Sequence, residues 1–260
     1  MRNKIYNILI FKYNNKNKKI SMSSRESKFD FNYEILPDNF TKYDISFKLI
    51  VIGDSGVGKS CLTTKATKNI FEDAYTATIG FEFFNFNIKI GDKIIKLQIW
   101  DTCGQELYRS LITNFYRNSS LAIIVYTVTS RDTFQNVELW LKELRTHSNP
   151  NVKVFLIGNK IDLEGQRKVT TEEGQRFYEQ NNLNKFMETS AKTGINALNL
   201  FIEAAKLLFD DYLLYHKSDE DYDSNSEVSD KKSNDKSSEP RSTTTGLYSG
   251  NEKKKWMLSI

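Results

Sequence analysis

Apolar and polar residues alternate in blocks through the middle of the chain, and the blocks have the lengths of strands and helices. Residues 121–128 form a continuous apolar run, which is typical of a strand buried on both faces of a sheet. Residues 81–90 and 93–100 alternate apolar and polar positions around Gly91-Asp92, which predicts a hairpin. The predicted strands cover residues 47–52, 81–90, 93–100, 121–128, 152–157 and 186–189.

Helices are predicted between these strands. Over residues 131–147, apolar side chains recur at helical spacing, as the positions of Phe134, Val137 and Leu141 show. The predicted helices cover residues 59–68, 131–147, 172–181 and 197–212. Because strands and helices alternate, we expect an α/β fold with a mostly parallel six-stranded sheet, one antiparallel edge strand and helices on both faces.

Composition divides the chain into three parts. Residues 46–213 hold all the predicted strands and helices, and we expect them to form one domain. Residues 1–45 are a polar extension, and residues 214–260 are a polar tail dominated by Ser, Asp, Glu, Lys, Asn and Thr. Such segments have too little apolar surface to offset the entropy cost of ordering, so we expect both to be disordered.

Composition and charge exclude several classes of protein. Of the 260 residues 39% are apolar, and the net charge of +4 gives no reason to expect a nucleic-acid-binding protein. The two cysteines, Cys61 and Cys103, cannot form a disulfide framework and suit a reducing cytosol. No apolar run approaches the roughly 20 residues needed to span a bilayer. The basic, Asn-rich residues 1–20 fit either a transit peptide or a simple compositional bias.

The first chemical motif is a glycine-rich loop. The stretch Gly53-Asp-Ser-Gly-Val-Gly-Lys59-Ser60 fits G-x-x-x-x-G-K-S and lies between a predicted strand and a predicted helix. In that context the backbone N–H groups form a nest for phosphate oxygens, Lys59 reaches the β- and γ-phosphates, and the Ser60 hydroxyl can bind Mg²⁺. A glycine-rich turn without a ligand is the alternative. The predicted phosphate-binding residues of this loop are Gly53, Asp54, Ser55, Gly56, Val57, Gly58, Lys59, Ser60 and Cys61.

Two later loops indicate guanine as the base. Asn159-Lys160-Ile161-Asp162 follows a predicted strand, and the Asp162 carboxylate can accept hydrogen bonds from N1–H and the 2-amino group of guanine. Adenine offers neither donor, and sites built on such pairs can discriminate by about 10⁴-fold. Ser190-Ala191-Lys192 can hold the base oxygen through a backbone N–H group. Asn-Lys-x-Asp alone could be a simple turn, but the order of these loops at strand ends supports a nucleotide site.

Three more residues are candidates for contacts with the γ-phosphate and a metal ion. Asp101 follows a predicted strand and is placed to hold Mg²⁺ through a water molecule, and the Thr78 hydroxyl can complete the metal shell. A backbone N–H group at Gly104 can bind the γ-phosphate. The predicted metal site therefore consists of Ser60, Thr78 and Asp101.

The motifs GDSGVGKS, TIGFEF, KLQIWDTCGQE, NKID and SAK, in this order and spacing, resemble those of a small GTPase of the Ras superfamily. IGFEF, KLQIWDT, QELYRSL and FYRNSS are similar to the Rab branch in particular. The resemblance covers about residues 45–213 and implies a P-loop NTPase G domain that binds GTP with Mg²⁺ and hydrolyses it slowly. It also implies a monomeric switch in vesicle-mediated transport, with effector proteins, an exchange factor and a GTPase-activating protein as partners.

Carried over by position, the resemblance implies roles for individual residues. Gln105 would be the catalytic residue that orients the attacking water. The ring of Phe71 would lie against the base, although composition alone favours a core position for it. Guanine would be held by Phe71, Asn159, Lys160, Asp162, Ser190, Ala191 and Lys192. An aromatic cluster would bind effectors, with plain burial of its rings as the alternative. The implied effector residues are Tyr75, Ile79, Gly80, Phe81, Phe83, Trp100 and Phe115.

Position 103 departs from the Rab pattern, because it is Cys where Rab proteins usually have Ala. The sulfur of Cys103 lies beside Gly104 and can crowd the phosphate and slow hydrolysis. A GTP-binding module with little intrinsic hydrolysis is therefore the second interpretation, and a P-loop kinase or ATPase is the third.

The C-terminal stretch departs too, since Rab proteins usually end in prenylated cysteines and no cysteine follows Cys103. We therefore expect a cytoplasmic protein that meets the cytosolic face of endomembranes only transiently. Its contact with membranes would be weak, through 253–256, or indirect, through a partner protein. Anchoring by the basic residues 1–20 in place of a lipid is the alternative.

Overall fold

The computed structural model describes residues 32–72, 78, 80–103 and 115–223, with residues 216–223 as backbone only. The chain divides into two compact units, residues 1–217 and 218–260. The sheet and the residues that surround it lie in the first unit. No helix in the described part of the chain is long and apolar enough to cross a membrane.

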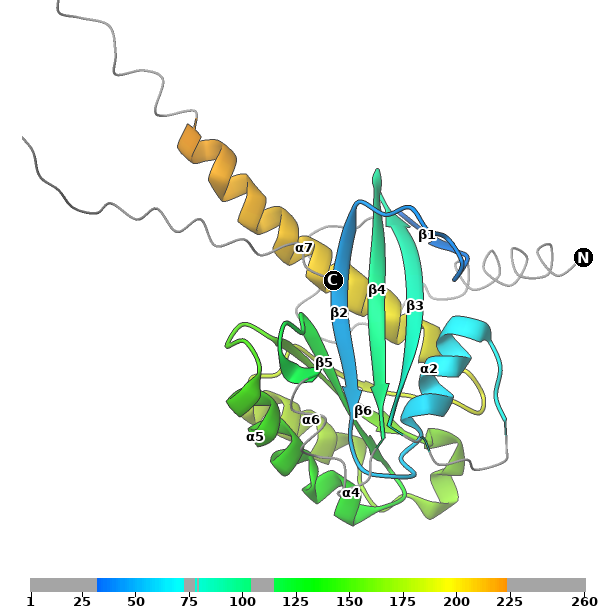
Figure 1. The fold of residues 1–260 in the computed structure, drawn as a ribbon. Helices are drawn as coiled ribbons and strands as arrows, with labels where there is room; N and C mark the ends of the chain where they lie inside the picture. The colour runs from blue at the N-terminus through cyan, green and yellow to red at the C-terminus, as the bar shows by residue number, and fades with distance from the viewer. Residues whose placement is uncertain (1–31, 73–77, 79, 104–114, 224–260) are drawn as a thin grey trace, which may run out of the picture. The chain divides into compact units, whose positions relative to one another are not determined.

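The first unit is built on a seven-stranded sheet with the strand order β1-β3-β4-β2-β5-β6-β7 (Figure 1). Strands β4, β2, β5, β6 and β7 are parallel, whereas β3 pairs antiparallel with β4 and β1 pairs antiparallel with β3. The strands are β1 (Tyr33–Leu36), β2 (Ile45–Ile52), β3 (Phe81–Ile90), β4 (Lys93–Thr102), β5 (Leu121–Thr127), β6 (Lys153–Asn159) and β7 (Lys185–Glu188). Every residue of β5 is buried, as its continuous apolar sequence predicts. The mostly parallel α/β fold is confirmed.

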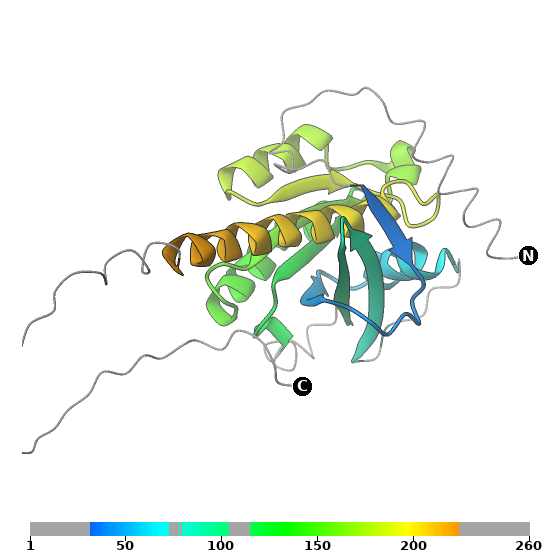
Figure 2. The ribbon, with the colours of Figure 1, turned by 90° about the horizontal axis from the view of Figure 1, so that it is seen from above.

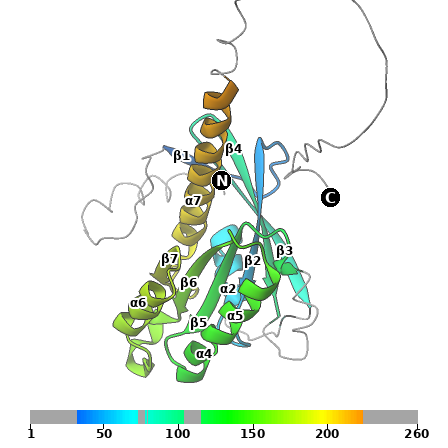
Figure 3. The ribbon, with the colours of Figure 1, turned by 90° about the vertical axis from the view of Figure 1, so that its left-hand side faces the viewer.

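Helices cover both faces of the sheet. The described helices are α2 (Lys59–Lys68), α4 (Arg131–Gln135), α5 (Val137–His147), the 3₁₀ helix η2 (Ile161–Gln166), α6 (Thr171–Gln180) and α7 (Ala197–Asp223). On one face α2 and α7 cover the sheet over a core that includes Leu49, Leu62 and Phe201, and α7 runs alongside the strands (Figures 2 and 3). On the other face α5 packs against β5, and the core there includes Ile50 and Trp140. The sheet is therefore the middle layer of three.

The sheet has one strand more than the six expected, and this strand lies in the extension that we expected to be disordered. Tyr33 and Ile35 of β1 pack against the core, and β1 pairs with the end of β3. The Asn87 side-chain amide donates to the carbonyl oxygens of Pro37 and Asp38 over 2.9 and 3.3 Å, which holds the following loop on the sheet. The prediction of disorder is therefore wrong for this stretch, because its few apolar side chains cover an edge of the sheet.

Two helix boundaries also differ from the prediction. The helix predicted over 131–147 is two helices, α4 and α5, which meet at Asn136. Helix α7 extends to Asp223, into the segment predicted to be a disordered tail, and its side chains Tyr212 and Leu213 pack against the core. Residues 224–260 and 1–31 lie outside the described part of the chain.

Candidate functional site

The loops that carry the motifs follow β2, β4, β6 and β7, and the carboxyl ends of these parallel strands meet at one edge of the sheet. The glycine-rich loop between β2 and α2 has little space around it. A Cβ atom at Gly53 would lie 2.2 Å from the carbonyl oxygen of Val125, and one at Gly58 would lie 2.5 Å from the side-chain nitrogen of Asn159. Both glycines also have positive φ angles, 138° and 95°. Only glycine fits either position.

Lys59 begins α2 and lies across this loop. Its ammonium group donates to the carbonyl oxygens of Gly53 and Asp54, each over 2.9 Å, and the residue is 5% exposed. Burial lowers the pKa of Lys59, whereas the carboxylates of Asp101 and Asp54 oppose that shift. A phosphate group at this loop would supply the strong charge partner that a buried ammonium needs.

The three predicted metal ligands lie together, although they come from α2, the loop before β3 and β4. The Ser60 hydroxyl oxygen lies 2.7 Å from that of Thr78 and donates a hydrogen bond to the Asp101 carboxylate. Asp101 is fully buried, and its second oxygen has no hydrogen-bond partner among the described residues. Burial raises the pKa of Asp101 to about 6. A buried carboxylate and two hydroxyl groups are the oxygen ligands that Mg²⁺ takes, so the residues fit this ion.

Asp54 is an acidic residue in a loop that should bind anions. Its carboxylate accepts a hydrogen bond from the indole nitrogen of Trp140 and another from the side-chain amide of Asn136, each over 2.8 Å. These donors direct the negative charge toward α5. Sequence reasoning missed both partners, because they lie 82 and 86 positions from Asp54 and no local pattern links them.

The two predicted guanine loops are joined to each other and to the phosphate loop. Asn159 donates to the Val57 carbonyl oxygen over 2.9 Å and accepts from the Ala191 N–H group over 3.3 Å. The Ser190 hydroxyl donates to the Asp162 carboxylate over 2.6 Å. These contacts bring the predicted base-binding side chains to the predicted phosphate site.

The remaining predicted guanine-binding residues are Lys160, Lys192 and Phe71. The Lys160 ammonium group donates to the Gly56 carbonyl oxygen over 2.6 Å, and Lys192 is exposed. Phe71 is half-buried and packs against the core on the α7 side, so both interpretations of its ring stay open.

The predicted effector residues on β3 and β4 form a cluster of rings. Phe83 and Trp100 are register partners with ring centroids 5.2 Å apart, and Phe81 lies 5.3 Å from Trp100 and 4.8 Å from Phe115. Phe81 is 51% exposed and Phe83 is 44% exposed. Burial therefore does not account for Phe81 and Phe83, whereas Trp100 and Phe115 are half-buried and pack against the core on the α5 side. The Lys48 ammonium group lies 5.6 Å from the Trp100 ring centroid, a contact that sequence reasoning missed.

Gly80, a predicted effector residue, lies just before β3, and Cys103 lies just after β4. Gly80 has a φ of 76°, and its carbonyl oxygen accepts from the Cys103 N–H group over 2.9 Å. The Cys103 side chain is buried. The predicted residues that lie outside the described part of the chain are Tyr75, Ile79, Gly104 and Gln105, and their roles stay predictions.

The site combines a glycine-rich loop between a parallel strand and a helix with a buried lysine. The Asn-Lys-x-Asp loop is hydrogen-bonded to the glycine-rich loop. These features define a P-loop nucleotide-binding domain. The family model of the Ras family matches residues 48–210. Over 162 residues the chain is 50% identical to the Ras-related protein RABA1c of Arabidopsis thaliana, and the match covers 62% of this chain and 74% of that protein. The chain belongs to the Ras family and is a small GTPase of the Rab type, which binds and hydrolyses GTP.

Proposed function

We propose that this Rab-type GTPase is a switch in vesicle-mediated transport that recruits effector proteins in its GTP-bound state. The observation that carries the proposal is the 2.7 Å contact between the hydroxyl groups of Ser60 and Thr78. It ties the loop before β3 to the phosphate site, and β3 begins with the exposed ring of Phe81. Contacts that depend on the γ-phosphate are lost on hydrolysis, so the nucleotide would control the aromatic surface.

Three groups of residues would hold the nucleotide. The phosphates would bind the loop from Gly53 to Cys61, with Thr78 and Gly104 at the γ-phosphate. The base would bind the guanine residues named above, with Asp162 as its selective acceptor. Mg²⁺ would be held by Ser60, Thr78 and Asp101, and when bound it would neutralise charge on the β- and γ-phosphate oxygens.

Hydrolysis would be slow without a partner. Gln105 would orient the attacking water, and unassisted enzymes of this kind turn over at about 10⁻⁴ per second. An activating protein can raise that rate by roughly 10⁵-fold. The GTP state would therefore last until such a protein ends it, and an exchange factor would restore it.

The partner surface would be the cluster of Phe81, Phe83, Trp100 and Phe115. Phe81 and Phe83 are exposed, and aromatic side chains are enriched at the centres of protein interfaces. The protein would act as a monomer, in the cytosol and at the cytosolic face of endomembranes.

A pair of opposite variants tests this function in cells. Gln105→Leu should hold the tagged full-length protein in the GTP state, and Ser60→Asn should prevent stable GTP binding with Mg²⁺. We expect Gln105→Leu to gather on one membrane compartment and Ser60→Asn to slow the transport of a secreted cargo. Ser148→Asn, which makes the same change outside the site, is the control. Identical distributions of all variants with unchanged cargo transport would contradict the proposal.

A further inference from the structure

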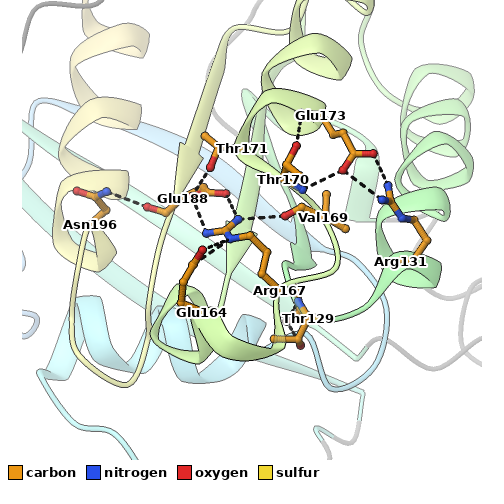
Figure 4. Close-up of polar contacts among 11 residues, drawn as sticks. Thr129, Arg131, Glu164, Arg167, Val169, Thr170, Thr171, Glu173, Glu188 and Asn196 are labelled. Atoms are coloured by element: carbon orange, nitrogen blue, oxygen red, sulfur yellow. Dashed lines mark hydrogen bonds and ion pairs between the residues drawn. The ribbon is translucent and has the colours of Figure 1, made fainter.

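Arg167 directly follows η2, and its guanidinium group lies between two carboxylates (Figure 4). The Nε atom is 2.8 Å from Glu164 Oε1, and the two terminal nitrogens are 2.7 and 3.2 Å from the two oxygens of Glu188. One terminal nitrogen also donates to the Val169 carbonyl oxygen over 3.0 Å. Four of the five N–H groups of this guanidinium are thus engaged.

These two carboxylates belong to the two segments that carry the predicted guanine residues. Glu164 lies in η2 beside Asp162, and Glu188 ends β7 just before Ser190. The Ser190 hydroxyl donates to Asp162 over 2.6 Å. Arg167 therefore joins the same two loops that meet at the Asp162 carboxylate.

The junction is largely shielded from solvent on one side. The side chains of Arg167 and Glu188 are each 16% exposed, whereas that of Glu164 is 67% exposed. The Glu188 carboxylate also accepts from the Thr171 hydroxyl over 3.1 Å. The Glu188 main-chain carbonyl oxygen accepts from the Asn196 amide over 2.8 Å, which anchors the loop that follows β7. Removing the guanidinium would leave a mostly buried carboxylate without a positive partner.

We propose that Arg167 is a positioning residue for the base: by bridging Glu164 and Glu188 it holds Asp162 and Ser190 in register and so sets the selectivity for guanine. The inference rests on the proposed role of Asp162. A planar fork can bond two carboxylates at once, whereas the ammonium of a lysine acts as a single point of charge. The identity of the side chain at position 167 therefore matters as well as its charge.

A second ion pair in the same region provides a matched control. Arg131 contacts Glu173 through two hydrogen bonds of 2.6 and 3.2 Å, nearly the same lengths as in the Arg167–Glu188 pair (Figure 4). It links α4 to the first turn of α6, and its side-chain contacts among the described residues include neither predicted guanine loop. Its loss would cost stability without disturbing Asp162.

The test compares two nucleotides that differ by one amino group. The full-length protein and its variants Arg167→Gln, Arg167→Lys, Glu188→Gln and Arg131→Gln are titrated with GDP and with inosine diphosphate in Mg²⁺ buffer. Inosine diphosphate lacks the 2-amino group that Asp162 would read. We expect Arg167→Gln and Glu188→Gln to lower the ratio of GDP affinity to inosine diphosphate affinity roughly tenfold. The affinity ratio of Arg167→Lys should lie between the ratios of these variants and that of the parent. Arg131→Gln should keep the parent ratio even if its Tm falls.

Three other outcomes would count against the inference or change its test. A parent protein that binds both nucleotides equally would refute the proposed contact between Asp162 and the 2-amino group, on which the inference rests. If the parent is selective and the variants at position 167 lose affinity for both nucleotides equally, Arg167 has only a structural role. If Arg167→Gln does not fold, Glu188→Gln decides in its place, and an unchanged ratio in that variant overturns the inference.

Discussion

The indole nitrogen of Trp140 donates a hydrogen bond over 2.8 Å to the carboxylate of Asp54, and this contact fixes the phosphate loop to helix α5. An acidic side chain in such a loop would repel phosphate if it faced the ligand. Trp140 is buried, and Asn136 supplies a second donor to the same carboxylate. The backbone of Asp54 meanwhile accepts from Lys59. Helix α5 is therefore linked through Asp54 to Lys59, the lysine that would bind the phosphates.

Trp140→Phe should weaken nucleotide binding, because it keeps the buried ring and removes the donor to Asp54. A hydrogen bond to a charged group contributes about 1.5–3 kcal/mol to stability, and only the part that orders the loop for nucleotide affects binding, so we expect GDP affinity to fall by up to about tenfold. A titration with GDP measures this change. In an Asp54→Ala background Trp140→Phe should have little effect, since its partner is absent. Equal losses in both backgrounds would show that the ring acts only by packing.

Lys59→Ala and Ser60→Asn should each weaken the binding of GTP with Mg²⁺. The first removes a buried ammonium group and the second replaces the hydroxyl that contacts Thr78 and Asp101. We expect losses of at least about tenfold for each, from the cost of losing a charge-assisted contact. Calorimetry with GTP in Mg²⁺ buffer gives the affinities, with Lys68→Ala at the other end of α2 as the control. Parent-like affinity in either variant would refute the phosphate-loop assignment.

Gln105→Leu should slow GTP hydrolysis while GTP affinity stays nearly unchanged. The reason is that Gln105 is assigned to the attacking water and makes no contact with the ground-state nucleotide in this account. Single-turnover hydrolysis and GTP titration separate the two effects. An unchanged rate would favour the second interpretation, a GTP-binding module with little intrinsic hydrolysis.

Cys103→Ala should raise intrinsic hydrolysis modestly, by less than about tenfold. The Cys103 side chain is buried, and its main-chain N–H group bonds Gly80 in the segment before β3, so relief of crowding would act on that segment. The same single-turnover assay measures the change, with Cys61→Ala as a second cysteine variant. No change, or a fall, would remove crowding as an explanation for this departure from the Rab pattern.

The sequence predicted the long elements well because their periodic patterns are local. The run at 121–128 and the hairpin about Gly91-Asp92 became β5 and the β3–β4 pair. Strand β1 was missed because its four residues stand in polar surroundings and become a strand only against the edge of β3. The break at Asn136 was missed because the amide of this residue reaches a carboxylate far away in the chain.

In the candidate site, too, residues in local motifs could be predicted and residues with distant partners could not. The motif residues could be predicted because each has a fixed spacing and a chemical role. Arg167 and Trp140 could not, since a single arginine after a loop and a tryptophan in an apolar helix face have no distinctive pattern. Their importance comes from partners that only the folded chain brings near, Glu188 and Asp54.

One titration tests most directly whether the site selects a guanine nucleotide. The full-length protein is titrated with GDP and with ADP in Mg²⁺ buffer at one temperature and salt concentration. Because Asp162 can accept two hydrogen bonds from guanine and none from adenine, we predict that GDP binds about 10⁴-fold more tightly than ADP. Affinities for GDP and ADP within tenfold of each other would contradict guanine selectivity.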